Sequence, residues 1–154
     1  MAAMLARATP SEPVAAIFID LDRFKEVNDA YGHDAGDCVL REAARRIAEV
    51  IRARGDVVWR PDGENPPTVR LGGDEFVVLL PGADDEGAAQ VADRIRQSLL
   101  EPIAIGPDLQ LTIGAAVGVA LAAEPAEPRD LLRRADAAMY EDKRRRPRPA
   151  QGFE

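Results

Sequence analysis

Two short acidic segments carry the residue types that bind metal ions. Asp20-Leu21-Asp22 follows a continuous apolar run, and Asp74-Glu75 follows a Gly-Gly pair. Because successive side chains of a strand point to opposite faces, we expect Asp74 and Glu75 to point in different directions. Hard carboxylate oxygens suit Mg²⁺, which takes one or two protein carboxylates together with substrate phosphates. Two such ions activate an attacking hydroxyl and stabilise a leaving phosphate, so the segments point to nucleotidyl transfer.

Each acidic segment can also be interpreted as purely structural, with no catalytic or metal-binding role. Acids commonly end buried strands, and a Gly-Gly turn with adjacent acids is common at a soluble hairpin tip. The residues alone leave this alternative open.

Several other kinds of site are excluded. The chain contains no G-x-x-x-x-G-K-[ST] phosphate loop and no strand followed by G-x-G-x-x-G and a helix. Phe24 stands where an EF-hand that begins at Asp20-x-Asp22 would need an oxygen ligand. His33 and Cys38 are the one histidine and the one cysteine, which excludes a zinc site made of either type. We interpret His33 as a loop residue that hydrogen-bonds locally.

Composition bounds the class of protein. The 154 residues suit one domain, and the net charge of -7 disfavours contact with nucleic acid. No apolar run approaches the roughly 18 residues of a membrane span, and no signal peptide is evident. A single cysteine forms no internal disulfide and fits a reducing compartment. We therefore expect a cytoplasmic domain cut from a longer protein, without membrane contact.

Apolar periodicity predicts elements in the order β-α-α-β-β-α-β-α. Residues 14–19 form a short apolar run, typical of a strand buried on both faces. Helical spacing predicts helices over 23–30, 35–53, 86–100 and from 128 onward. The other strands of this order are predicted on both sides of the Gly-Gly pair and over 109–121 with a break at Gly114, and residues 57–59 are a candidate for an additional strand. This order predicts an α/β (α+β) sandwich with a mixed central β-sheet flanked by helices.

Three stretches resemble the motifs of one family. Gly72-Gly73-Asp74-Glu75-Phe76 reproduces the motif that names the GGDEF domain family, the diguanylate cyclases. Residues 18–37, FIDLDRFKEVNDAYGHDAGD, are similar to the family's first motif. Residues 135–140, ADAAMY, with Lys143 close behind, resemble the motif of its last helix. The motifs occur in the family's order, and the resemblance covers roughly residues 14–145.

The resemblance implies both a fold and a reaction. The fold is that of nucleotide-cyclase and polymerase palm domains, and two GTP condense into cyclic di-GMP with loss of two pyrophosphates. It implies a homodimer whose subunits each hold one GTP, Mg²⁺ or Mn²⁺ as cofactor, and an upstream sensory domain outside this chain. We expect residues 1–13 to be the end of a leading helix and a linker, 14–146 the GGDEF domain, and 147–154 a flexible C-terminal tail.

The resemblance assigns roles to individual residues. Asp20 and Asp74 hold the metal with help from the Leu21 carbonyl, while Glu75 contributes to the metal site and helps activate the ribose 3′-hydroxyl. Asn28 and Asp37 read guanine, whose N1–H and exocyclic amine suit a carboxylate acceptor. The remaining nucleotide-binding positions are Phe24, the phosphate-neutralising Lys25 and Lys143, and the phosphate-approaching Gly72 and Gly73.

The sequence departs from the family pattern at four places. The lead-in Asp-x-Leu-Thr-Gly-Leu-x-Asn-Arg is absent, and the loop from Pro61 to Pro67 is an insertion. The usual Lys-x-x-Gly-Arg-Asn is replaced, since Arg146, Pro147 and Arg148 end the motif. We expect Arg146 or Arg148 to substitute for the missing phosphate-binding arginine. Ala116 replaces the serine of the Ser-Ile-Gly-Val strand.

A product-inhibition site is also altered. Many family members carry Arg-x-x-Asp before the Gly-Gly pair, and its counterpart here is Asp56, preceded three residues earlier by Ala53. Arg52 and Arg54 flank that position, but one residue along a helix turns a side chain by about 100°. We therefore expect weak or absent product inhibition.

Two other functions stay open. A degenerate GGDEF domain would bind GTP or c-di-GMP as a sensor without turnover, which the altered tail and the insertion favour. A purely structural dimerisation module is the second. Intact Asp20, Asp74 and Glu75 favour the active cyclase.

Overall fold

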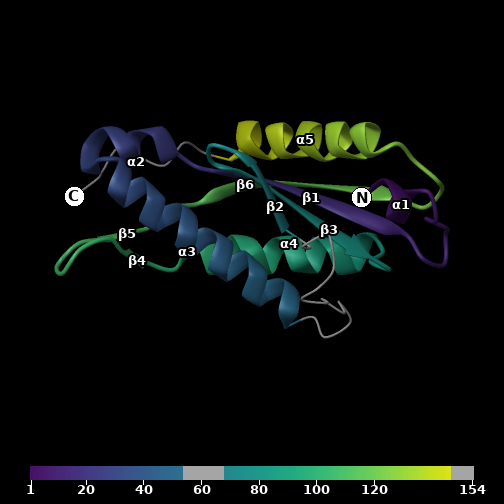
Figure 1. Cartoon of the computed structure of the whole chain (residues 1–154), viewed down its shortest axis with the longest axis horizontal. Helices are drawn as coiled ribbons and strands as arrows, with labels where there is room; N and C mark the ends of the chain where they lie inside the picture. Colours follow the sequence, from purple (N-terminus) through teal and green to yellow (C-terminus); the bar gives the residue numbers. More distant parts are fainter. Residues whose placement is uncertain (54–67, 147–154) are drawn as a thin grey trace.

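The computed structural model describes residues 1–53 and 68–146 (Figure 1). Its elements follow the predicted alternation of strands and helices. They are α1 (Ala2–Leu5), β1 (Val14–Leu21), α2 (Phe24–Tyr31), α3 (His33–Arg52), β2 (Thr68–Gly72), β3 (Glu75–Pro81), α4 (Asp85–Leu100), β4 (Ile103–Ala104), β5 (Gln110–Leu111), β6 (Ala115–Ala122) and α5 (Pro128–Arg145). No helix in this part of the chain is long and apolar enough to cross a membrane.

The central sheet has the strand order β2-β3-β1-β6. The predicted sandwich of helices on a central sheet is confirmed, but the prediction of a mixed sheet is wrong for the described strands. Every pairing among them is antiparallel. The reason lies in the helical connections. The α2–α3 segment lies between β1 and β2 in the chain, and α4 lies between β3 and β6. In the sheet, however, β3 stands between β1 and β2, and β1 stands between β3 and β6. The strands joined through helices are therefore not neighbours, and each pairs with an antiparallel strand instead.

Helices cover both faces of the sheet. Figure 1 shows α5 on one face and α3 with α4 on the other. Because side chains of a strand alternate between faces, β1 contributes to two separate apolar clusters. Ala15, Ile17, Ile19 and Leu21 belong to the α3–α4 cluster, whereas Val14, Ala16 and Phe18 belong to the α5 cluster. A strand buried on both faces is what the unbroken apolar run predicts.

Helix α5 lies directly on the edge strand β6. A Cβ on Gly118 would stand 2.0 Å from the backbone nitrogen of Met139 and 2.2 Å from the carbonyl oxygen of Ala135. No side chain fits in that space, so glycine sets the distance between helix and strand. This close approach fixes the C-terminal turn of α5, which carries Lys143.

Most predicted elements are confirmed within a few residues. The helix predicted over 35–53 is α3. Asp84 is the N-cap of α4, and its Oδ1 accepts a hydrogen bond from the Gly87 N–H at 2.8 Å. The strand predicted over 109–121 with a break at Gly114 corresponds to two separate strands, β5 and β6. The short strand β4 was not predicted. The strand predicted at 57–59, the loop of residues 61–67, Asp56 and the tail 147–154 lie outside the described residues.

The residues before β1 contact the folded domain. Leu5 of α1 is fully buried in the α5 cluster, and its carbonyl accepts a hydrogen bond from the Ala126 N–H at 3.4 Å. The Pro13 carbonyl accepts one from Gly82 at 2.7 Å. The division of the chain at residue 13 stays a prediction.

A buried arginine joins α3 to the end of α4. The guanidinium of Arg46 donates to the backbone carbonyls of Ser98, Glu101 and Pro102 at 2.6–2.8 Å. It also pairs with Glu42 at 2.7 Å. Helix ends leave carbonyls without intrahelical partners, and Arg46 satisfies them from a neighbouring helix. Its hydrogen bonds thus fix how α3 packs against α4.

We predict that Glu42→Gln lowers the free energy of unfolding at pH 7 by about 1–2 kcal/mol, since charge-assisted hydrogen bonds are lost. Hydrogen bonds from Arg45 and Arg46 lower the pKa of Glu42 from 4.5 to about 2. Because the pKa of Glu42 is lower in the folded protein than in the unfolded chain, its ionised carboxylate stabilises the fold at pH values above the unfolded pKa. This stabilisation is lost as the pH falls through the folded-state pKa. The difference between the two proteins should therefore shrink between pH 5 and pH 2. Urea unfolding across this range measures it, and a constant difference would contradict the assignment.

Candidate functional site

The β1–β3 ladder brings the two acidic segments together. Asp20 lies directly opposite Glu75 in the antiparallel register. Residues opposite one another share a face of the sheet, and this face is the one that α5 covers. Asp74 stands in the turn between β2 and β3, where its backbone carbonyl accepts a hydrogen bond from the Leu21 N–H at 3.1 Å. Asp20 from one part of the sequence and Asp74-Glu75 from another are therefore placed at the same end of the sheet.

The turn that presents Asp74 requires glycine. Gly72 has a φ of 147° and Gly73 a φ of 54°, both in the left-handed half of backbone space. Residues that carry a side chain rarely adopt these backbone conformations. No atom lies within 4 Å of a Cβ built on either glycine. The two glycines thus leave an open backbone surface beside the acids.

Lys143 of α5 neutralises part of this charge. Its Nζ lies 3.1 Å from Oδ2 of Asp20. The other carboxylate oxygen, Oδ1, is buried and has no hydrogen-bond partner among the described residues. Burial raises the pKa of Asp20 above 3.8, the nearby charges of Asp74 and Asp22 act in the same direction, and Lys143 opposes them.

Glu75 experiences the same excess of negative charge. Burial raises its pKa above 4.5, and the carboxylates of Asp20, Asp74 and Asp136 raise it further. Asp136 lies on α5, so that helix contributes an acid as well as a base to the neighbourhood. A cluster with more negative than positive charge attracts cations.

The carboxylates fit a divalent cation that also takes substrate oxygens. Among residues 1–53 and 68–146, no three acidic, histidine or cysteine side chains already converge as a complete metal cage. Mg²⁺ does not require such a cage, because it keeps water and binds phosphate through its remaining positions. The buried, unpartnered Oδ1 of Asp20 is an anionic oxygen that lacks a ligand. Asp20, with Asp74 and Glu75 beside it, would hold the ion.

A second ion pair closes the end of β1. The guanidinium of Arg146 holds Asp22 with two hydrogen bonds, of 2.8 and 3.0 Å. Asp22 is fixed from the other side, because its N–H donates to the Gly114 carbonyl at 2.8 Å and a Cβ on Gly114 would lie 2.7 Å from its Oδ2. Arg146 stands where the family motif has glycine. In this structure it binds the carboxylate of Asp22, the residue that follows β1, and Arg148 lies outside the described residues.

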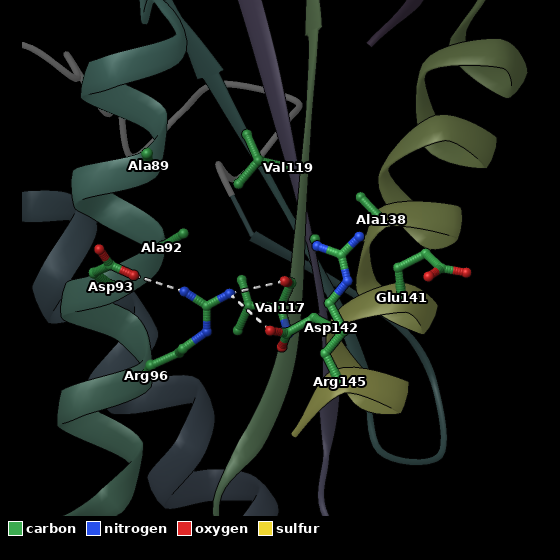
Figure 2. A pocket seen from close by; sticks show the side chains of 11 residues that line it. Ala89, Ala92, Asp93, Arg96, Val117, Val119, Ala138, Glu141, Asp142 and Arg145 are labelled. Carbon is green, nitrogen blue, oxygen red and sulfur yellow. Dashed lines mark hydrogen bonds and ion pairs between the residues drawn. The ribbon is translucent and has the colours of Figure 1, made fainter. Parts of the chain in front are cut away.

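The network continues along the free edge of β6. Asp142 pairs with Arg146 at 3.3 Å and accepts a hydrogen bond from the Val117 N–H at 2.9 Å. Arg96 of α4 donates to the Val117 carbonyl at 3.0 Å and pairs with Asp142 at 3.5 Å. Figure 2 shows Arg96 of α4 and Asp142 of α5 meeting at Val117 of β6. They satisfy backbone groups that a neighbouring strand would otherwise pair, which protects the edge.

A groove of about 440 Å³ lies beside this network, between α4 and α5 (Figure 2). Its lining includes Arg96, Val117, Asp142 and Arg145. None of the site residues predicted from the sequence lines it. β6 forms the sheet edge here, whereas the acidic residues end β1 and begin β3 on the opposite side of β6. The groove and the carboxylate site are therefore separate features.

The predicted guanine-reading residues lie on α2 and α3. Arg23, with a φ of 58°, lets α2 follow β1 with two residues between them, and Gly32, with a φ of 85°, separates α2 from α3. This tight connection packs the two helices together, so that Asn28 of α2 contacts Gly36, the residue before Asp37. Asn28 is half-buried and Asp37 exposed. Of the other nucleotide-binding positions, Lys25 is exposed on α2 and Phe24 is half-buried against the core.

The structure thus groups the predicted residues in two places. Asp20, Leu21, Asp74, Glu75, Gly72, Gly73 and Lys143 lie around the end of the β1–β3 ladder, and Phe24, Lys25, Asn28 and Asp37 lie on α2 and α3. Sequence reasoning missed the Arg146–Asp22 pair, Asp142 and Gly36. The i,i+4 spacing of Asp142 and Arg146 was a signal for the ion pair between those two residues. The Arg146–Asp22 pair had no such local signal, and Gly36 showed none beyond its place in the motif.

A palm-like sheet with paired acids at the strand ends defines a class of nucleotidyl-transferring domains. The family described as "Diguanylate cyclase, GGDEF domain" matches residues 1–148. The chain belongs to the GGDEF family.

The similar proteins agree with this assignment. The chain is 43% identical over 135 residues to diguanylate cyclase TpbB of Pseudomonas aeruginosa, covering 86% of this chain and 28% of TpbB. A crystal structure of the GGDEF domain of that protein (YfiN or TpbB) matches with a TM-score of 0.70 and 39% identity, over 88% of this chain and 78% of that one. The GGDEF domain of DgcB from Caulobacter crescentus, in complex with c-di-GMP, matches with a TM-score of 0.71 and 27% identity, over 86% and 73%. The chain therefore spans less than a third of the length of TpbB.

We predict an energetic coupling between Arg146 and Asp22. The variants Arg146→Met, Asp22→Asn and the double variant form a mutant cycle whose coupling energy should be about 1–2 kcal/mol, because a two-pronged, partly buried ion pair is lost in each single variant. Urea unfolding supplies the free energies. Arg144→Met, in the same helical turn but with an exposed side chain, is the control and should change stability by under about 0.5 kcal/mol. Additive effects of the two changes would contradict the contact.

Proposed function

We propose that this domain is a diguanylate cyclase, which condenses two GTP into cyclic di-GMP and two pyrophosphates. The observation that carries the proposal is the register of β1 against β3, which places Asp20 opposite Glu75 with Asp74 in the adjoining turn. A buried carboxylate oxygen without a partner is costly unless a cation or a donor reaches it. Mg²⁺ or Mn²⁺, when bound there, would polarise the reacting phosphate and neutralise its charge.

The chain's own residues position and deprotonate the nucleotide. Glu75 accepts the proton of the ribose 3′-hydroxyl, since its residue stands opposite the metal-binding Asp20 at the end of the β1–β3 ladder. Lys143 neutralises the triphosphate, since its ammonium already stands 3.1 Å from Asp20 at the edge of the site. Gly72 and Gly73 admit the phosphates to the backbone. Lys25 adds a second positive charge from α2.

The guanine base would be read between α2 and α3. Asp37 accepts from the N1–H and exocyclic amine, and the Asn28 carboxamide supplies a donor and an acceptor. Adenine offers no such pair of donors at those positions. The discrimination therefore depends on polar groups that the wrong base would leave unpaired.

Two copies of the domain are required for the full reaction. Cyclic di-GMP contains two phosphodiester linkages, and in each the 3′-oxygen of one GTP attacks the α-phosphate of the other. One domain has one set of guanine-reading residues, so a homodimer must bring two loaded sites face to face. Since the chain spans 28% of the length of TpbB, the domain that controls this meeting is expected outside the chain.

A second candidate is a domain that binds GTP or c-di-GMP as a sensor without turnover. One observation favours it: Arg146 replaces the family's glycine and is held by Asp22 and Asp142 rather than left available to phosphate. The intact carboxylate cluster favours the cyclase.

We predict that Asp20→Asn and Asp74→Asn each abolish product formation, because the metal loses an anionic anchor. Purified protein is incubated with GTP and Mg²⁺, and the products are separated by chromatography. Asp108→Asn, at an exposed position between β4 and β5, is the control and should retain activity. Normal c-di-GMP production by either folded site variant would refute the metal assignment. GTP binding without any product from the unaltered protein would establish the sensor, and no GTP binding would leave only a structural module.

We predict that Asn28→Ala and Asp37→Ala each weaken GTP binding by about 1–3 kcal/mol and leave ATP binding unchanged, since each removes a hydrogen bond that only guanine completes. Equilibrium binding of both nucleotides measures the difference. Asp34→Ala, an exposed acid in the first turn of α3, is the matched control. Equal affinities of the unaltered protein for ATP and GTP would overturn the assignment of base specificity.

A further inference from the structure

Gly36 occupies an unusual place in α3. It is buried in the first turn of the helix, and its φ is not in the left-handed region, so its backbone conformation does not require glycine. What requires glycine is space. A Cβ built on Gly36 would stand 1.9 Å from Oδ1 of Asn28 and 2.9 Å from its Cγ. Atoms that are not bonded do not approach so closely, and Asn28 therefore fills the volume that a side chain at position 36 would take.

The carboxamide of Asn28 is held by this packing rather than by hydrogen bonds. The structure gives its side chain no hydrogen-bond partner within the described residues, although the group is half-buried. Phe24, one turn earlier on α2, closes the same space, since its Cζ would lie 3.2 Å from the Gly36 Cβ. The polar atoms of Asn28 thus keep their hydrogen-bonding capacity for a ligand, while the surroundings restrict where those atoms stand.

We propose that Gly36 is a specificity-determining residue, which sets the position of the Asn28 carboxamide relative to Asp37. The inference rests on the proposed role of Asn28 in reading guanine. Gly36 precedes Asp37 directly, so the residue that receives Asn28 and the residue that completes the base-reading pair belong to the same helical turn. Gly36 acts through Asn28 and is a positioning residue, without a contact to the nucleotide of its own.

The kind of atom that meets the added methyl determines what a substitution does. At Gly118 the methyl would meet the backbone of α5, which cannot move without disturbing the fold. At Gly36 it would meet the end of a side chain, which moves by rotating about its own bonds. Alanine is also the better helix former at an interior position. Gly36→Ala should therefore keep the fold and displace the Asn28 carboxamide.

The test is a double-mutant cycle read by nucleotide binding. The unaltered protein, Gly36→Ala, Asn28→Ala and the double variant are titrated calorimetrically, in the presence of Mg²⁺, with 3′-deoxy-GTP and 3′-deoxy-ATP, which lack the attacking hydroxyl and do not turn over. We expect Gly36→Ala to weaken 3′-deoxy-GTP binding about tenfold, similar to Asn28→Ala, and to leave 3′-deoxy-ATP binding unchanged. The double variant should bind 3′-deoxy-GTP within about twofold of Asn28→Ala, because effects through one shared group are not additive.

The cycle separates this inference from the function on which it rests. If Asn28→Ala binds 3′-deoxy-GTP normally, Asn28 does not read guanine and both proposals fail. If Asn28→Ala weakens binding and Gly36→Ala does not, or if the two effects add, the inference about Gly36 alone is overturned. Thermal unfolding covers the case in which Gly36→Ala does not fold. Restored folding in the double variant, where the Asn28 amide is gone, supports the proposed packing, and failure of both variants to fold overturns it.

Discussion

The antiparallel pairing of β1 with both of its neighbours is the constraint on which the site depends. β1 lies between β3 and β6, and its register brings Asp20 opposite Glu75 on one side and opposite Ala116 on the other. A shift of this register by one residue would turn the apolar faces of the strand to the wrong layers, because side chains alternate with a period of two. Burial of β1 on both faces therefore fixes the register, and the register fixes where the carboxylates stand.

Helix α5 links this sheet to the charge of the site. Gly118 allows the helix to lie directly on β6, and its last turn then places Lys143 beside Asp20 and Arg146 beside Asp22. These pairs offset part of the negative charge that the ladder concentrates. Burial is the main cause of the raised pKa values of Asp20 and Glu75, and the neighbouring carboxylates raise them further. A divalent cation bound there would stabilise the charged form of these carboxylates.

Glycines shape the domain through space as much as through backbone conformation. Gly72 and Gly73 need their left-handed conformations for the turn, whereas Gly36, Gly114 and Gly118 leave volume that a neighbouring side chain or helix fills. Arg46 provides a complementary constraint on the other side of the sheet, since it ties α3 to the carbonyls that end α4. The orientation of α3, which carries Gly36 and Asp37, follows from the packing at Gly36 and from the hydrogen bonds of Arg46.

The amino-acid sequence by itself determined the order of the main helices and strands, both faces of β1, the glycine turn and the family, because periodicity and motifs are local along the chain. It also indicated the acidic residues, but it did not establish that they meet. Tertiary structure decided that the described sheet is antiparallel, since strand adjacency depends on which strand is inserted between two connected by a helix. It also decided that Arg146 binds Asp22 and that Asn28 fills the space at Gly36. Those contacts join residues from different elements, and the side-chain volumes and charges that select them act only once the chain has folded.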